Sequence, residues 1–103
     1  MKFKIDKAEI ISEFQSLAAV ADKKQTLPIL SNILIRCEPD SVRLLSTDLE
    51  VELEVCLSGA NIEQPGETTI PAKKAADIIR ELPEGQVSFE LNEENSKLTV
   101  KSS

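Results

Sequence analysis

The sequence predicts an α+β fold in which two helices pack on antiparallel sheet. Residues 10–21 and 72–82 carry apolar side chains at intervals of three and four, the spacing of an amphipathic helix. Several shorter segments alternate apolar and polar residues, which is typical of half-buried strands. Such alternation favours an antiparallel sheet, because one face of each strand meets the core and the other meets water. The length of 103 residues corresponds to one small domain, residues 1–103.

The first half of the chain is expected to run strand, helix and three strands. The first strand covers residues 2–6, and a helix follows Asp6 and Glu9, which have the spacing of a capping box. The helix is expected to end near residues 22–24, because the lysines there suit a helix C-terminus. An irregular connection through Pro28 then leads to three strands, at residues 33–37, 42–47 and 49–57.

The third of these strands has the plainest alternation in the chain. Its apolar positions are Leu49, Val51, Leu53 and Val55, and its acidic positions are Glu50, Glu52 and Glu54. A period of two places the apolar set on one face of the strand and the three carboxylates on the other. The sequence therefore predicts a row of glutamates on the solvated face of the sheet.

The second half is expected to run strand, helix and two strands. A loop at 59–66 precedes a short strand at 67–70, a helix from Pro71 to about Leu82, a strand at 87–91, a polar turn at 92–96 and a last strand around 98–100. Proline suits the first turn of a helix, where its missing N–H costs nothing. Because this half is one strand shorter than the first, we expect the last strand of the domain to be missing and the chain to be a fragment.

The acidic charge of the chain is concentrated in one stretch. The formal net charge is −6, and residues 36–67 hold two basic and eight acidic residues, so that the remainder is neutral. Basic residues elsewhere form small clusters at 23–24 and 73–74, with Arg80 near the second cluster. A domain with one acidic surface and local positive charge on another can still meet DNA in one orientation.

The composition excludes several kinds of chemistry. A chain without histidine has no Ser-His-Asp or Cys-His pair and no histidine-ligated zinc. Cys37 and Cys56 are too far apart for a CxxC motif; they are expected as small core side chains, with a disulfide between them as the alternative. A metal-dependent hydrolase using Asp48, Glu50 and Glu52 is a third, weaker hypothesis, since carboxylates on an open sheet are usually just solvated. No cofactor or bound metal is expected.

The location expected for the protein is the cytoplasm, with no membrane association. The longest apolar runs are a few residues, far below the span of a membrane, and the first residues lack the apolar stretch of a signal peptide.

The second helix presents three faces at about 100° per residue. They are a core stripe (Ala72, Ala75, Ala76, Ile79 and Leu82), a second face (Lys73, Asp77 and Arg80) and a third face (Lys74, Ile78 and Glu81). The second face is either solvated, with local ion pairs, or a surface that contacts phosphates. The third face is unusual because Ile78 is apolar and off the core stripe. It is either a single exposed residue or the apolar anchor of a protein interface.

Five segments together resemble a known family. They are residues 1–3 (MKF), 26–32 (TLPILSN), 47–50 (TDLE), 69–74 (TIPAKK) and 82–85 (LPEG). In order and spacing they are similar to the N-terminal domain of the bacterial sliding clamp, the beta subunit of DNA polymerase III. The likeness covers the whole chain.

The resemblance implies a DNA-clamp fold and a non-catalytic role in DNA replication. Family members are processivity factors: two three-domain subunits join head to tail into a ring that encircles duplex DNA and tethers the polymerase. Such subunits are sometimes classed as DNA-directed DNA polymerases, a kind of nucleotidyltransferase, because they associate with the polymerase holoenzyme. The resemblance assigns DNA contacts to Lys24, Lys73 and Arg80, and the subunit interface to Lys74 and Ile78. DNA polymerase III and the clamp loader would bind through domains outside this chain.

The first helix lacks the basic character expected of a helix that contacts DNA. The outer side of the first helix, with Glu9, Ser12, Glu13 and Ser16, is not basic, so this helix is a weaker candidate for phosphate contact. The alternative function is a stand-alone protein-binding module of the same fold that forms no ring and uses Lys74, Ile78 and an exposed sheet edge.

Overall fold

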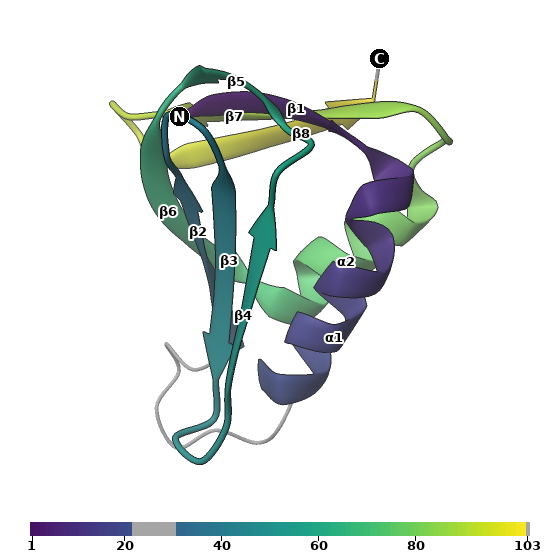
Figure 1. The fold of residues 1–103 in the computed structure, drawn as a ribbon, viewed down its shortest axis with the longest axis vertical. Coiled ribbons are helices and arrows are strands. Elements are labelled where there is room, and N and C mark those ends of the chain that lie inside the picture. Colours follow the sequence, from purple (N-terminus) through teal and green to yellow (C-terminus); the bar gives the residue numbers. More distant parts are fainter. Residues whose placement is uncertain (22–30, 103) are drawn as a thin grey trace.

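The computed structural model of the chain describes residues 1–21 and 31–102 (Figure 1). In chain order the elements are β1 (Lys2–Asp6), η1, a 3₁₀ turn (Lys7–Glu9), α1 (Ile11–Ala21), β2 (Asn32–Cys37), β3 (Val42–Thr47), β4 (Glu52–Leu57), β5 (Asn61–Gln64), β6 (Gly66–Pro71), α2 (Ala72–Glu81), β7 (Gln86–Asn92) and β8 (Lys97–Ser102). The strands form two four-stranded sheets, sheet A (β5-β1-β7-β8) and sheet B (β4-β3-β2-β6). Every strand pair is antiparallel, which confirms the predicted fold class.

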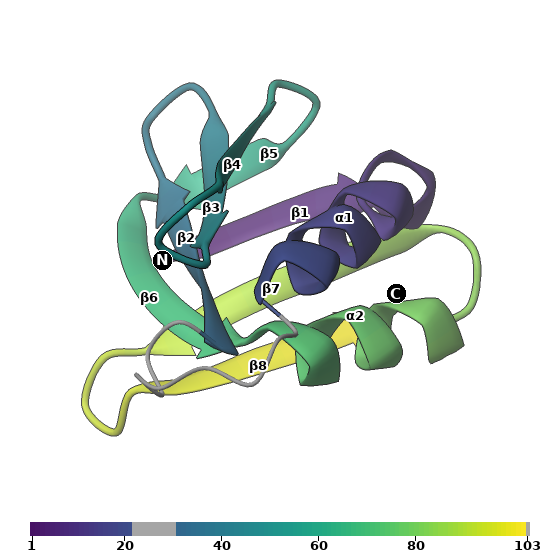
Figure 2. The same cartoon turned by 90° about the horizontal axis from the view of Figure 1, so that it is seen from below.

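The two sheets and the two helices enclose one core. β5 and β6 follow one another directly, so the chain passes from sheet A to sheet B at this point. The sheets diverge from there, and α1 and α2 lie side by side across the open side between them (Figures 1 and 2). One face of each sheet and one face of each helix are thereby buried against each other, while the opposite faces meet solvent.

Three phenylalanines hold sheet A to the first helix. Phe3 of β1 and Phe89 of β7 stack with ring centroids 4.7 Å apart, and the ring centroid of Phe14 in α1 lies 6.2 Å from that of Phe89. All three side chains are buried. Offset aromatic packing of this kind adds to the area that the rings remove from water. The core therefore depends on Phe89, which contacts both of the others.

The start of the first helix follows the sequence prediction with one difference. The Asp6 carboxylate accepts a hydrogen bond from the Ala8 amide, as a helix cap does, but it caps the 3₁₀ turn η1. The α-helix itself begins at Ile11. The predicted helix end at residues 22–24, Lys24 included, and the connection through Pro28 lie outside the described residues.

The strand predicted at 49–57 is shorter than expected. β4 begins at Glu52, and the residues before it form the turn between β3 and β4. Leu49 and Val51 are therefore exposed instead of facing the core, and Glu50 does not belong to the strand. The predicted row of three glutamates reduces to two, Glu52 and Glu54.

Side chains of two residues explain this early turn. The Thr47 hydroxyl accepts from the Leu49 amide, and the Asp48 carboxylate accepts from the amides of Glu50 and Val51. These bonds hold backbone N–H groups in a turn conformation that competes with pairing in a strand.

Two other predictions for the middle of the chain are wrong. The loop predicted at 59–66 contains β5, which pairs with β1 and forms the edge of sheet A. Cys56 is exposed on β4 rather than buried in the core. Cys37 is buried, as predicted, and both thiols are free, so no disulfide joins them.

The second half matches the prediction closely. β6, α2, β7 and β8 lie within a residue or two of the expected bounds, apart from Pro71, which precedes the helix instead of occupying its first turn. β8 is one of the two edge strands of sheet A as described, and a further strand beyond it stays a prediction. Among the described residues, no helix has the length and apolar character needed to cross a membrane.

Candidate functional site

The helix α2 carries the described residues that were predicted to contact DNA or the second subunit, Lys73, Lys74, Ile78 and Arg80. Its buried side is formed by Ala72, Ala75, Ala76 and Ile79, which confirms four of the five residues of the predicted core stripe; the fifth, Leu82, follows the helix and is only partly buried. The small alanines let α2 lie close to α1, beside which it packs. Two polar faces remain, and they meet different surroundings.

The C-terminal end of α2 is held by one buried residue from the other end of the chain. The Lys7 ammonium donates hydrogen bonds to the carbonyl oxygens of Arg80, at 3.1 Å, and Leu82. The Lys7 amide donates to the carbonyl oxygen of Gly85. A cation suits this position because the last carbonyl groups of a helix lack partners within the helix and carry partial negative charge. This contact was not predictable, because a single lysine after a strand carries no sequence signal for it.

On the face with Lys73 and Arg80, the two cations differ in their surroundings. The Arg80 guanidinium lies 3.3 Å from the Asp77 carboxylate and 3.8 Å from that of Glu81. Both pairs are solvent-exposed, so each contributes at most about 1 kcal/mol. Lys73 is exposed and forms no ion pair with the part of the chain that the structure describes. Lys73 therefore offers the less compensated charge to an anion.

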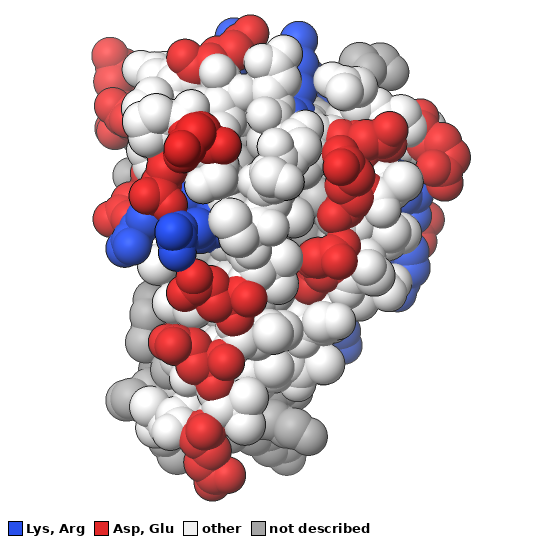
Figure 3. Space-filling view, viewed as in Figure 1, with Lys and Arg blue, Asp and Glu red and all other residues white. Residues whose placement is uncertain are grey.

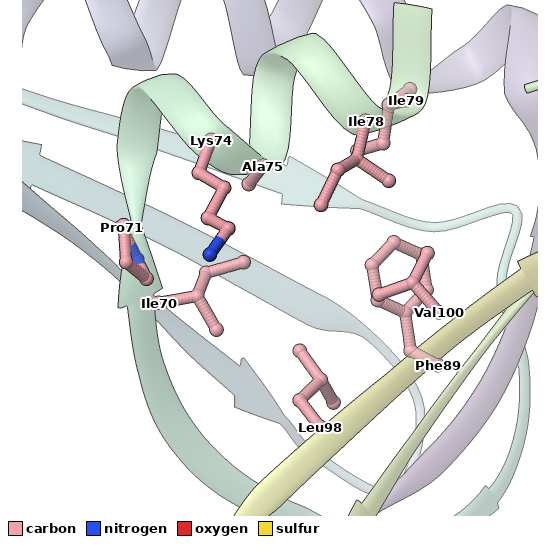
Figure 4. A pocket seen from close by; sticks show the side chains of 9 residues that line it. All are labelled: Ile70, Pro71, Lys74, Ala75, Ile78, Ile79, Phe89, Leu98 and Val100. Carbon is pink, nitrogen blue, oxygen red and sulfur yellow. The ribbon is translucent and has the colours of Figure 1, made fainter. Parts of the chain in front are cut away.

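On the other face, Lys74 and Ile78 border an apolar groove (Figure 4). The groove has a volume of about 180 Å³ and lies between α2, the end of β6 and sheet A; its apolar lining includes Ile70, Pro71, Phe89, Leu98 and Val100. Ile78 is 41% exposed. Helical spacing predicted a special role for Lys74 and Ile78 but not for the β8 residues opposite them, because spacing within one strand does not show which helix the strand faces.

The outer face of sheet B is acidic, and its arginines are already paired. Arg36 and Arg43 are direct cross-strand partners, which alone would be unfavourable. Glu67 lies 2.9 Å from Arg36, and Glu38 and Glu54 both pair with Arg43. The hydrogen bond and charge of Glu38, together with Glu54, raise the pKa of the Arg43 guanidinium above its ordinary value.

Carboxylates are spread widely over the side of the molecule that carries β4, where basic side chains form one group at the left of the view, with others at its top and right edges (Figure 3). This side therefore repels polyanions more than α2 does. Asp48, Glu50 and Glu52 offer no metal site. Within residues 1–21 and 31–102, no three Cys, Asp or Glu side chains are placed so that together they could hold a metal ion.

Two helices lying side by side against two antiparallel sheets, which the chain joins between β5 and β6, define this chain as a domain of the DNA-clamp class. The sequence model for the N-terminal domain of the DNA polymerase III beta subunit matches residues 1–103. The chain belongs to this family.

Relatives and solved structures agree with the assignment. The Beta sliding clamp of Pseudomonas aeruginosa is 40% identical over 101 residues, 98% of this chain and 27% of the relative. That of Escherichia coli K12 is 34% identical over 103 residues, 99% of this chain and 28% of the relative. A Bacillus subtilis sliding-clamp structure superposes with a TM-score of 0.93 at 25% identity, over 100% of this chain and 29% of that one. A P. aeruginosa sliding-clamp structure superposes with a TM-score of 0.89 at 38% identity, over 100% of this chain and 28% of that one. The chain thus spans little more than a quarter of the length of these proteins.

Proposed function

We propose that this chain is the N-terminal domain of a ring-shaped sliding clamp that encircles duplex DNA and tethers DNA polymerase III during replication. The likeness of the whole chain to proteins named sliding clamps carries this proposal. The clamp acts without catalysis: a closed ring stays on DNA by topology and needs no tight local contact. A replication factor of this kind would work in the bacterial cytoplasm. DNA polymerase III and the clamp loader would bind other domains of the same subunit.

The two polar faces of α2 would serve two partners. Lys73, with Arg80 and Lys24, would contact phosphates in the bore of the ring, where contacts position DNA without reading its sequence. Lys74 and Ile78 would contact the second subunit of a head-to-tail dimer. This division is supported by the exposed charge of Lys73, which forms no ion pair with a described residue, on one side and by the apolar groove on the other.

The proposal is tested by retention on circular and linear DNA. The full subunit is loaded onto nicked circular plasmid by its clamp loader, the plasmid is linearised, and retention is measured by gel filtration. Retention on circles and loss from linear DNA is the expected result. Equal retention on both would contradict topological tethering. It would favour the alternative, a stand-alone protein-binding module, for which the apolar groove is the supporting observation.

Reversing the charge of Lys73 is expected to weaken the association of the assembled ring with DNA. Each phosphate contact that the substitution removes lowers the magnitude of the slope of log K against log salt by about 0.9. The measurement is fluorescence anisotropy of labelled duplex with Lys73→Glu over a range of salt concentrations.

The matched control is Lys4→Glu, which changes the net charge equally. Lys4 is exposed on β1 of sheet A, away from α2. The control should leave the slope unchanged, as should Glu52→Lys on sheet B. Equal effects of Lys73→Glu and Lys4→Glu would show that net charge alone matters and would contradict an oriented DNA contact.

A further inference from the structure

The turn between β3 and β4 presents two large apolar side chains to solvent. Leu49 is 70% exposed and Val51 is 54% exposed, more than any other large apolar residue among those described. Neither packs against the core of this domain. The turn lies at the end of sheet B, where β3 passes into β4 (Figure 1).

The backbone of the turn is held in a conformation that does not suit leucine. Leu49 has φ of 80°, in the left-handed region that glycine or asparagine adopts more readily. Thr47 and Asp48 hold it there: the Thr47 hydroxyl donates to the Val51 carbonyl oxygen at 3.0 Å, and the Asp48 amide donates to the same oxygen at 3.1 Å. The chain thus accepts both a strained backbone and exposed apolar surface at one residue. Folding of this domain alone gains nothing from either.

We infer that Leu49 and Val51 dock against the next domain of the same polypeptide. This inference rests on the proposed function, in which the chain is one domain of a longer subunit. More than two thirds of the length of the relatives lies outside the matched region, so a further domain is available to cover the turn.

The sheet topology indicates where that domain would sit. β4 is an edge strand of sheet B, so its outward backbone groups have no partner strand in the described part of the chain. The turn leads directly into this edge, and a domain that packs along β4 would also cover Leu49 and Val51. Glu50 lies between the two apolar residues and Glu52 follows them, and neither forms an ion pair with the described residues. The docking surface would therefore combine an apolar hollow with lysine or arginine at its rim.

Cysteine labelling of the full-length subunit tests this docking. Leu49→Cys and Val51→Cys are made separately in a Cys56→Ser background, because Cys56 is exposed. Cys37 stays in place, since it is buried and burial raises the pKa of its thiol. The reference is Glu94→Cys, at an exposed position in the turn between β7 and β8. Rates of reaction with N-ethylmaleimide are measured by mass spectrometry and normalised to the same peptide in denaturant.

Docking predicts that both turn cysteines react at least about tenfold more slowly than the reference, since labelling would need the domains to separate. Two positions are used so that a folding defect at one, visible as a lost cooperative melt, does not decide the result. If the cysteine variants that still fold react at rates within about threefold of the reference, the docking is overturned. Protection that disappears in the Ile78→Asp background would also overturn it, because the cover would then be the second subunit.

Light scattering on the same samples separates this inference from the proposed function. A dimeric subunit with reactive turn cysteines contradicts the docking alone. A monomeric subunit with protected turn cysteines contradicts the ring and supports the docking.

Discussion

Ile78→Asp is expected to convert the dimeric full-length subunit into a monomer. Ile78 borders the apolar groove of α2 and is 41% exposed in the isolated domain. A carboxylate placed there would lose its hydration on association and would replace the apolar contact that Ile78 makes. Loss of an apolar interface anchor costs roughly 2 kcal/mol or more, about thirtyfold in the dissociation constant. Light scattering coupled to gel filtration, over a range of concentrations, measures the change in mass.

The matched control is Lys73→Asp, which places the same side chain on the other polar face of α2. It should leave the dimer intact. Because Ile78 is partly exposed, its substitution should change the free energy of unfolding by less than about 1 kcal/mol, which a circular-dichroism melt can verify. An unchanged mass for Ile78→Asp would contradict the assignment of this face to the subunit interface.

Those elements whose side chains alternate regularly, or recur at helical spacing, were predictable from sequence. The strand predicted at 42–47 has its observed bounds, and the predicted bounds of α2 agree within a residue at each end. In both elements one face is buried along the whole length, so the apolar period and the structure agree. The sheet order was not predictable, because pairing of β1 with β5 and β7 joins distant parts of the chain.

The errors arose where local side-chain hydrogen bonds or sheet pairing decided the structure. The alternation from Leu49 to Val55 continues unbroken through a turn, and the period alone cannot show where pairing starts. Thr47 and Asp48 were the available signal, since both residue types bond to nearby amides. The short strand β5 has no such signal, because its four residues have little alternation and pair with a strand far away in sequence.

The division of α2 into three faces was predictable from the sequence. Which of its charged side chains form ion pairs was not. Helical spacing placed Lys74 and Ile78 together and away from Lys73, and the groove agrees with this division. The ion pairs of Arg80 with Asp77 and Glu81 depend on rotamers, which spacing does not determine. Of the two described candidates for phosphate contact, the structure therefore favours Lys73.

Phe89→Ala is expected to remove a large part of the stability of the domain. Phe89 is 1% exposed and lies between the rings of Phe3 and Phe14, so its loss empties the contact between sheet A and α1. Truncation of a buried phenylalanine costs about 3–5 kcal/mol, against a total of about 5–15 kcal/mol for a typical domain. A urea titration followed by far-ultraviolet circular dichroism measures the change, since the chain has no tryptophan or tyrosine for fluorescence.

The comparison of Phe89→Ala with Phe14→Ala tests why the effect is large. The ring of Phe14 stacks on that of Phe89 alone, whereas the ring of Phe89 stacks with those of both Phe3 and Phe14. Phe89→Ala should therefore cost more than Phe14→Ala, while Ile78→Ala on the exposed face of α2 should cost less than about 1 kcal/mol. A loss below about 1 kcal/mol for Phe89→Ala would mean that the sheets and helices hold together without the aromatic contact. The core would then depend on the aliphatic side chains of the two sheets instead.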